Sequence, residues 1–103
     1  MTTEIQSTIA AQIQARELVF AGFSVYNDGT NGVTVQKGWK AVKIIYNEGS
    51  DLYDVSTFTM GRDYHVNKET TEGLFWEDLK SFIEGFFPNF RYVMDGLVVS
   101  AQR

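Results

Sequence analysis

Residues 39–59, WKAVKIIYNEGSDLYDVSTFT, constrain the fold most, because they have the pattern of two β-strands joined by a short turn. Every second residue from 42 to 46 is apolar, which is the two-residue period of a half-buried strand. Residues 47–51 are turn formers, and residues 52–59 are rich in β-branched and aromatic side chains. This stretch therefore predicts a β-hairpin whose apolar face must be covered by other parts of the chain.

The pattern leaves open which face of the second strand points inward. Tyr53 and Val55 share one face, whereas Leu52 and Phe58 fall on the opposite face together with Asp54. A β-bulge near Phe58, or apolar cover on both faces, would reconcile these two sets.

Two helices are predicted, one before and one after the strands. Thr2 or Thr3 can cap the first helix. Its apolar stripe comprises Ile5, Ile9 and Ile13. Thr70 or Thr71 can cap the late helix, which we expect to end by about Phe87 because a proline follows. The apolar face of this late helix comprises Phe75, Leu79, Phe82, Ile83 and Phe86.

Further strands and turns flank the hairpin. Residues 18–26 have strand chemistry on both faces, residues 27–32 hold two Asx-Gly turn signals, and residues 33–36 form the returning strand. After the hairpin we expect a short edge strand at residues 64–66 and a polar linker at residues 67–72.

Together these elements predict a single α+β domain over residues 1–103. Its antiparallel β-sheet is a meander of about four strands packed against the N-terminal helix and the late helix. Residues 90–101 add a C-terminal hairpin with its turn at Asp95 and Gly96. The chain is long enough to bury a core without disulfides or metals.

The charge is uneven, and this bears on the kind of partner. The formal net charge is -4; residues 1–47 hold three acids and four bases, whereas residues 48–95 hold ten acids and four bases. Binding to phosphates needs lysines and arginines, so direct nucleic-acid binding is disfavoured. A basic host protein, or a second copy of the chain paired through a sheet edge, is the favoured partner. We expect a cytoplasmic protein, since neither a signal peptide nor an apolar run of roughly 20 residues is visible.

The residue types give no catalytic or metal-binding pattern, so we predict no catalytic residue, cofactor or metal. There is no cysteine and one histidine, His65, so zinc would depend on carboxylates that it seldom accepts alone. Asp51 and Asp54, or the acids between Glu69 and Asp78, would suit acid–base work or Mg²⁺, but a turn and a helix start also explain them. An enzyme that uses His65 with a nearby carboxylate is kept as an alternative.

The candidate partner-binding residues belong to the late helix: Trp76, Glu77, Asp78 and Phe87. Trp76 lies one position off the apolar face of that helix, so we expect it to be partly exposed and to form a contact patch with Phe87. Three lysines near the start of the hairpin have two interpretations, contact with phosphate or an acidic partner, and plain solvation or edge protection. These are Lys37, Lys40 and Lys43.

Three stretches resemble a family of small uncharacterised proteins encoded by phages and prophages: TEIQSTIAAQI, VKIIYNEGSDLYDVSTF and EGLFWEDLKSFIE. The resemblance covers roughly residues 3–85 and implies a leading helix, a β-meander and a closing helix. It also implies a viral or prophage origin and an intracellular setting, without an assigned activity. Residues 16–23 depart from the pattern, because they lack the family's Gly-Gly and the basic residue of its Thr-Gly-Ala-Lys stretch.

The leading hypothesis is a small non-enzymatic binding protein of phage origin. The first alternative is a phage inhibitor of a host defence or DNA-processing protein, which presents an acidic surface to a basic groove. The second alternative is the enzyme that uses His65. A structural role in the virion is also kept open.

Overall fold

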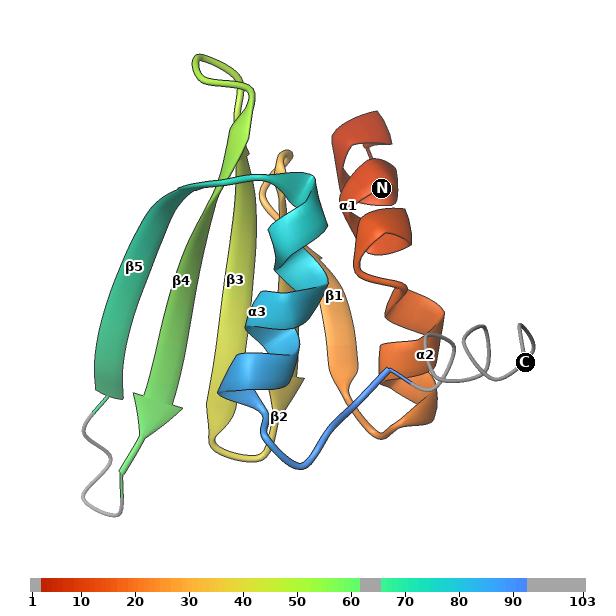
Figure 1. The fold of residues 1–103 in the computed structure, drawn as a ribbon, viewed down its shortest axis with the longest axis vertical. Helices are drawn as coiled ribbons and strands as arrows, with labels where there is room; N and C mark the ends of the chain where they lie inside the picture. Colours follow the sequence, from red (N-terminus) through yellow and green to blue (C-terminus); the bar gives the residue numbers. More distant parts are fainter. Residues whose placement is uncertain (1–2, 62–65, 93–103) are drawn as a thin grey trace, which may run out of the picture.

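One antiparallel sheet, built from five strands in the order β1-β2-β3-β4-β5, organises the described part of the chain (Figure 1). The computed structural model describes residues 3–61 and 66–92. The strands are β1 (Ser24–Asp28), β2 (Gly32–Lys37), β3 (Lys40–Asn47), β4 (Leu52–Met60) and β5 (Val66–Leu74). The helices are α1 (Glu4–Gln12), α2 (Ala15–Phe20), the 3₁₀ turn η1 (Trp76–Asp78) and α3 (Leu79–Phe86). The predicted α+β class and its meander are confirmed, with five strands in place of about four.

The helices cover one face of the sheet, and the core lies between them and the strands (Figure 1). The helices contribute Ile9, Leu18, Leu79 and Ile83, and the C-cap of α1 contributes Ile13; all five are fully buried. The sheet contributes Val33, Val35, Val42, Ile44 and Val55, all at most 1% exposed. The predicted stripe of α1 is therefore confirmed, because Ile9 and Ile13 meet the sheet and Ile5 packs partly buried beside them.

The central hairpin forms as predicted and resolves the question of its second strand. In the register of β3 and β4, Ile44 lies opposite Val55 and Tyr46 lies opposite Tyr53. Tyr53 and Val55 therefore face the core, and Asp54 lies on the outer face. The irregularity is located between Tyr53 and Val55 in the pairing with β5, so the first of the two alternatives, a bulge near Phe58, is wrong.

The strand predicted over residues 18–26 is wrong in its first half. Residues 15–20 form α2, whose Leu18 alone is buried, and β1 begins only at Ser24. The helix ends in a Schellman motif: Gly22 has φ +96°, its N–H donates to Val19, and the N–H of Phe23 donates to Leu18. Gly22 was the sequence signal for this helix end.

The polar linker predicted at residues 67–72 is an edge strand. β5 pairs with β4 from Val66 to Thr71 and again at Leu74, and the Thr70 hydroxyl lies 3.1 Å from that of Ser56. Every residue of β5 except Leu74 is exposed, so the strand carries no hydrophobic period. The N-cap predicted at Thr70 or Thr71 is therefore wrong as well, since both belong to β5.

The late helix begins later than predicted and ends where predicted. Phe75 is 59% exposed and precedes η1, so its assignment to the buried helical face is wrong. Leu79 and Ile83 are buried as expected, and α3 ends at Phe86. Of the C-terminal hairpin predicted at residues 90–101, residues 90–92 are not in a strand and the rest lies outside the described residues.

Two of the three hairpin lysines bind the ends of helices. The Lys37 ammonium donates to the carbonyl of Ala21, the C-cap of α2, at 3.0 Å. The Lys40 ammonium donates to the carbonyl of Phe86, the last residue of α3, at 3.1 Å. A cation at a helix C-terminus satisfies an unpaired carbonyl and the helix dipole together. The two lysines therefore fix both helices to the β2–β3 turn.

We expect Lys40→Met to destabilise the fold by about 1 kcal/mol, because it keeps the aliphatic stem and removes the cation from the end of α3. Lys68→Met on exposed β5 removes the same charge and is the control, with an expected change below about 0.5 kcal/mol. Urea denaturation measures both. Equal losses for the two variants would mean that net charge, not the helix end, sets the effect.

Candidate functional site: a groove between α1, the β3–β4 turn and Trp76

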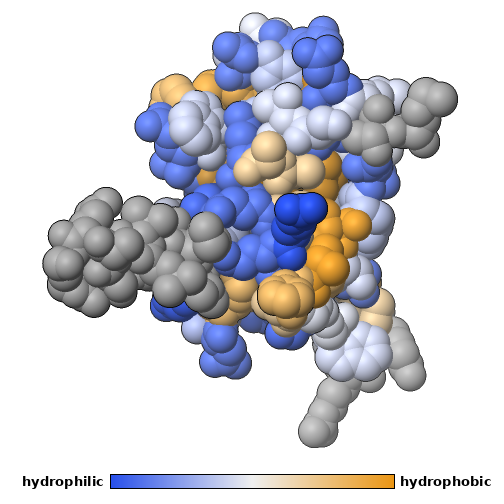
Figure 2. Space-filling model, turned by 90° about the vertical axis from the view of Figure 1, so that its right-hand side faces the viewer, coloured by the Kyte–Doolittle hydropathy of each residue, from blue (hydrophilic) through white to orange (hydrophobic). Residues whose placement is uncertain are grey.

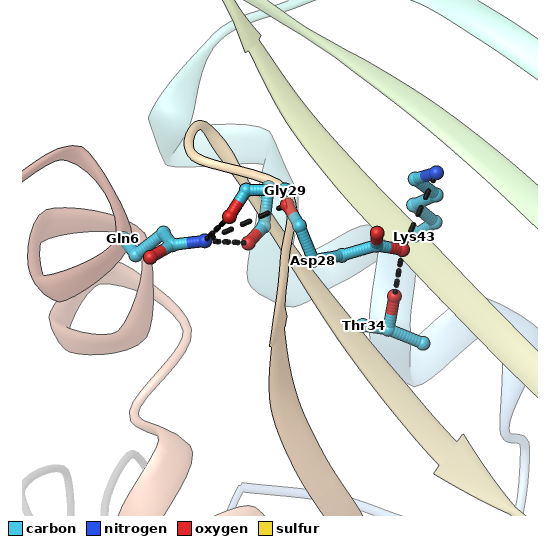
Figure 3. A network of polar contacts seen from close by, with 6 residues as sticks. Gln6, Asp28, Gly29, Thr34 and Lys43 are labelled. Carbon is cyan, nitrogen blue, oxygen red and sulfur yellow. Dashed lines mark hydrogen bonds and ion pairs between the residues drawn. The ribbon is translucent and has the colours of Figure 1, made fainter. Parts of the chain in front are cut away.

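A buried glutamine positions α1 on the sheet (Figure 3). Gln6 is fully buried, and its side-chain amide donates to the carbonyls of Gly29 and Gly32, both at 3.0 Å, and to that of Asp28 at 3.5 Å. Its amide oxygen accepts from the N–H of Thr3, which closes a capping box at the start of α1. The Thr-x-x-Gln pattern was the sequence signal for this anchor. The first turn of α1 is thereby held against the β1–β2 turn.

A groove of about 680 Å³ lies beside this anchored turn. Its walls are the first turns of α1, the ends of β3 and β4 with their turn, and the two residues that follow β5. The lining residues are Thr3, Glu4, Ile5, Thr8, Gln12, Tyr46, Asp51, Tyr53, Phe75 and Trp76. Segments far apart in the sequence thus meet at one end of the sheet.

Four aromatic side chains shape the groove. The rings of Tyr46 and Tyr53 are cross-strand neighbours with centroids 5.5 Å apart. The hydroxyl of Tyr53 donates to the side-chain oxygen of Gln12 at 2.8 Å, which ties β4 to α1. Phe75 and Trp76 are 59% and 55% exposed. The groove therefore combines a fixed aromatic floor with two large, solvent-exposed rings.

Both tyrosines in the groove are held in the neutral form. The hydrogen bond from the Tyr46 hydroxyl to the Asp51 carboxylate raises the pKa of Tyr46, and burial and the nearby negative charges add to it. Burial raises the pKa of Tyr53, partly offset by its bond to Gln12. Since the ordinary tyrosine pKa is about 10, both phenols are protonated at neutral pH. They act here as hydrogen-bond donors, not as bases.

The charge of the groove is negative. Its lining includes the carboxylates of Glu4 and Asp51 and no lysine, arginine or histidine. Within residues 3–61 and 66–92, the ion pair joins Lys43 to Asp28 at 3.3 Å, and both lie on the outer face of the sheet (Figure 3). Neither acid of the groove is thus neutralised by a described basic side chain.

The structure separates the four predicted partner-binding residues. Trp76 lines the groove, and Glu77 and Asp78 are exposed beside it on η1, where Asp78 accepts from the N–H of Phe75 at 3.4 Å. Phe87 is only 7% exposed and packs edge-on against Phe23, with centroids 4.8 Å apart. The prediction that Trp76 and Phe87 form one exposed patch is therefore wrong, because Phe87 belongs to the core.

Sequence reasoning missed most of the groove. Glu4, Tyr46, Asp51 and Tyr53 were assigned to a helix, two strands and a turn, without a common site. The one available signal was that Tyr46 and Tyr53 flank the turn symmetrically, which brings them opposite each other in a hairpin.

The acids outside the groove form no metal-binding cluster among the described residues. Asp54 accepts from the N–H of Gly73 at 3.2 Å on the outer face. No group of three or more potential metal ligands occurs within residues 3–61 and 66–92. His65 lies outside these residues. None of the described helices combines the length and the apolar character needed to cross a membrane.

A second exposed apolar surface lies on α2. Val19 is 56% exposed and Phe20 is 97% exposed. The side of the molecule shown in Figure 2 has a hydrophobic area right of the centre and smaller hydrophobic areas elsewhere among polar residues. The open hollow beside α2 includes Val19, Phe20 and the basic Arg16 but no acid. It therefore offers apolar contact without the negative charge of the groove.

Comparison with known proteins gives no functional information, so the functional proposal depends on the groove. No family model, no curated protein and no solved structure matches the chain. The resemblance to small phage and prophage proteins stays a prediction.

Proposed function

We propose that the protein is a non-enzymatic, protein-binding domain that receives an apolar side chain of its partner in the groove. The observation that carries the proposal is the pair of large rings at the groove rim, Phe75 and Trp76, each more than half exposed. Exposing such rings to water is unfavourable, and exposed tryptophans beside a concave surface are typical anchors of protein interfaces.

The chemical groups that line the groove favour binding over catalysis. Its lining offers two neutral phenols and two carboxylates, together with the hydroxyls of Thr3 and Thr8. A nucleophile needs an adjacent base, usually with a third group that orients it. The Thr3 hydroxyl donates to the carbonyl of Thr30 and the Thr8 hydroxyl to the carbonyl of Glu4, so each hydroxyl bonds to backbone and not to a carboxylate of the lining. The enzyme that uses His65 stays an alternative, and His65 lies outside the described residues.

The inhibitor of a host protein is the second candidate, and the exposed acids of η1 favour it. Glu77 and Asp78 adjoin Trp76, and Glu4 and Asp51 lie in the groove next to it. A basic partner would then be bound through charge as well as through Trp76. Under this proposal the setting is the cytoplasm of a bacterium that carries the phage. Its binding would weaken as salt rises and be lost on double reversal of Glu77 and Asp78 to lysine.

Self-association through the β5 edge of the sheet is less favoured than binding in the groove, because of the charges on that edge. β1 and β5 are the two edges, and β5 carries Lys68, Glu69 and Glu72. Charged side chains along an edge oppose pairing with another strand. Light scattering tests the prediction of a homodimer directly.

Selection from a displayed random-peptide library tests the proposed function. We expect wild-type protein to enrich peptides that share an apolar anchor. Trp76→Ala should weaken binding of the enriched peptide about tenfold or more, because a central tryptophan anchor is removed. Trp39→Ala is the matched control, since Trp39 is 69% exposed at the β2–β3 turn, at the other end of the sheet (Figure 1).

Isothermal titration with the enriched peptide measures the two variants. Circular dichroism first establishes that both are folded. Equal affinity of the wild-type protein and Trp76→Ala would refute the groove as the binding site. The same conclusion would follow if the library yielded no shared sequence.

A further inference from the structure

We infer that the partner segment carries a lysine or arginine next to its apolar anchor, and that the groove binds this cation between its aromatic rings and Asp51. The inference rests on the proposed function and specifies the chemistry of the partner. It follows from three properties of the groove: carboxylates without a basic partner among the described residues, a carboxylate held in place, and exposed aromatic faces.

Within residues 3–61 and 66–92, no basic side chain pairs with the carboxylates of the groove. Glu4 and Asp51 line the groove, the lining has no basic residue, and the ion pair among the described residues is elsewhere, between Lys43 and Asp28. A partner that brought a second acid would meet repulsion, and a neutral partner would leave the carboxylates without compensation. A basic side chain is the complement of this surface.

The carboxylate of Asp51 is positioned before any ligand arrives. One of its oxygens accepts from the neutral Tyr46 hydroxyl, whose ring packs against Tyr53. The backbone of Asp51 adopts φ +58°, a left-handed conformation that aspartate and asparagine tolerate better than most residues. A fixed carboxylate forms a charge-assisted hydrogen bond at a lower entropic cost than a mobile one.

The aromatic rings supply the second contact. A cation within about 6 Å of a ring centroid is attracted to the ring face, most strongly to tryptophan. The same chain already makes this contact internally, with the Lys40 ammonium 4.9 Å from the Phe86 ring centroid and the Lys80 ammonium 4.8 Å from that of Tyr92. In the groove, Tyr46 and Trp76 offer such rings near a carboxylate that no described lysine reaches.

The acids also have local structural roles, and the test must separate these from binding. Glu4 lies in the first turn of α1, where the helix dipole favours an acid. Asp51 ends the β3–β4 turn. Asp51→Asn removes the charge while keeping both a residue suited to φ +58° and an oxygen that accepts from Tyr46. Glu48→Gln is the matched control, because Glu48 is exposed in the same turn but does not line the groove.

Three peptides of the form acetyl-Gly-Leu-Xaa-Leu-Gly-amide provide the probe, with Xaa as lysine, norleucine or glutamate. Norleucine keeps the aliphatic stem of lysine and lacks its charge. Binding is followed by the indole NMR signal of Trp76 in Trp39→Phe protein, which contains one tryptophan. We expect the lysine peptide to bind about tenfold more tightly than the norleucine peptide, and the glutamate peptide to bind most weakly.

The two variants then show whether Asp51 is responsible for the preference for the lysine peptide. In Asp51→Asn the ratio of lysine to norleucine affinity should fall to about twofold, whereas in Glu48→Gln it should stay near tenfold. Equal binding of the lysine and norleucine peptides would overturn this inference and leave the proposed function standing. An unchanged ratio in Asp51→Asn would overturn it too. If none of the three peptides shifted the Trp76 signal, both the inference and the proposed function would fail.

Discussion

Leu79→Asp is expected to unfold the protein at room temperature. Leu79 is fully buried at the start of α3, so the variant loses the burial of a leucine and places a carboxylate in the core without a partner. Loss of a core leucine alone costs about 2 to 5 kcal/mol, and an unpaired buried charge adds several more. Domains of this kind are stable by about 5 to 15 kcal/mol, so little or no stability remains. Far-ultraviolet circular dichroism should show loss of the folded spectrum.

Two further variants test whether the loss of stability comes from core packing: a milder substitution of Leu79, and the same charged residue placed on the surface. Leu79→Ala should fold and lose about 2 to 5 kcal/mol in urea denaturation. Phe20→Asp introduces the same charged group at the end of α2, where the side chain is 97% exposed, and should change stability by less than about 1 kcal/mol. If Phe20→Asp unfolded the protein as fully as Leu79→Asp, the assignment of Phe20 to the surface and Leu79 to the core would be wrong.

Gln6→Leu is expected to lower the free energy of unfolding by about 3 kcal/mol. The leucine fills the site but leaves the carbonyls of Gly29 and Gly32 without the amide that binds each at 3.0 Å. An unsatisfied buried polar group costs about 1 to 3 kcal/mol, and loss of the capping box adds to it. Urea denaturation measures the change. Ser7→Leu, on the exposed side of the same helix, is the control and should change stability by less than about 0.5 kcal/mol.

Gln6→Glu adds a pH signature to the same site. A buried carboxyl that faces carbonyl oxygens favours its protonated form, so its pKa in the folded state should lie above the unfolded value of about 4.3. The folded state then binds a proton that the unfolded state has lost. The stability of this variant relative to Gln6→Leu should therefore be highest at low pH and fall as the pH rises above about 4.3. A flat difference between the two variants across pH would contradict the burial of Gln6 against these carbonyls.

The elements that the sequence predicted correctly are those that bury one face. The hairpin of β3 and β4 alternates between apolar and polar residues, and α1 places Ile5, Ile9 and Ile13 on one side, so burial imposes the period on the sequence. β5 was not predicted as a strand because both of its faces are exposed, so its sequence has no hydrophobic period of two residues. α2 was not predicted as a helix because its exposed residues Val19 and Phe20 are types that favour strands.

The candidate site was predictable only in part, for a physical reason. The exposure of Trp76 followed from its position beside the helical face. The convergence of Glu4, Tyr46, Asp51 and Trp76 depends on tertiary structure, because Gln6 fixes the placement of α1 and the strand register fixes the two tyrosines. Phe87 was expected to form a contact patch with Trp76, whereas its contact with Phe23 places it in the core.

The central claim is that the groove beside Trp76 is the surface that binds a partner. Its most direct test is the fluorescence of Trp76 in Trp39→Phe protein, titrated with the peptide enriched from the random library. We expect a saturable blue shift of the Trp76 emission, with the same dissociation constant as in calorimetry, because the indole passes from water into the interface. A peptide that binds with full heat and leaves the Trp76 emission unchanged would contradict the account.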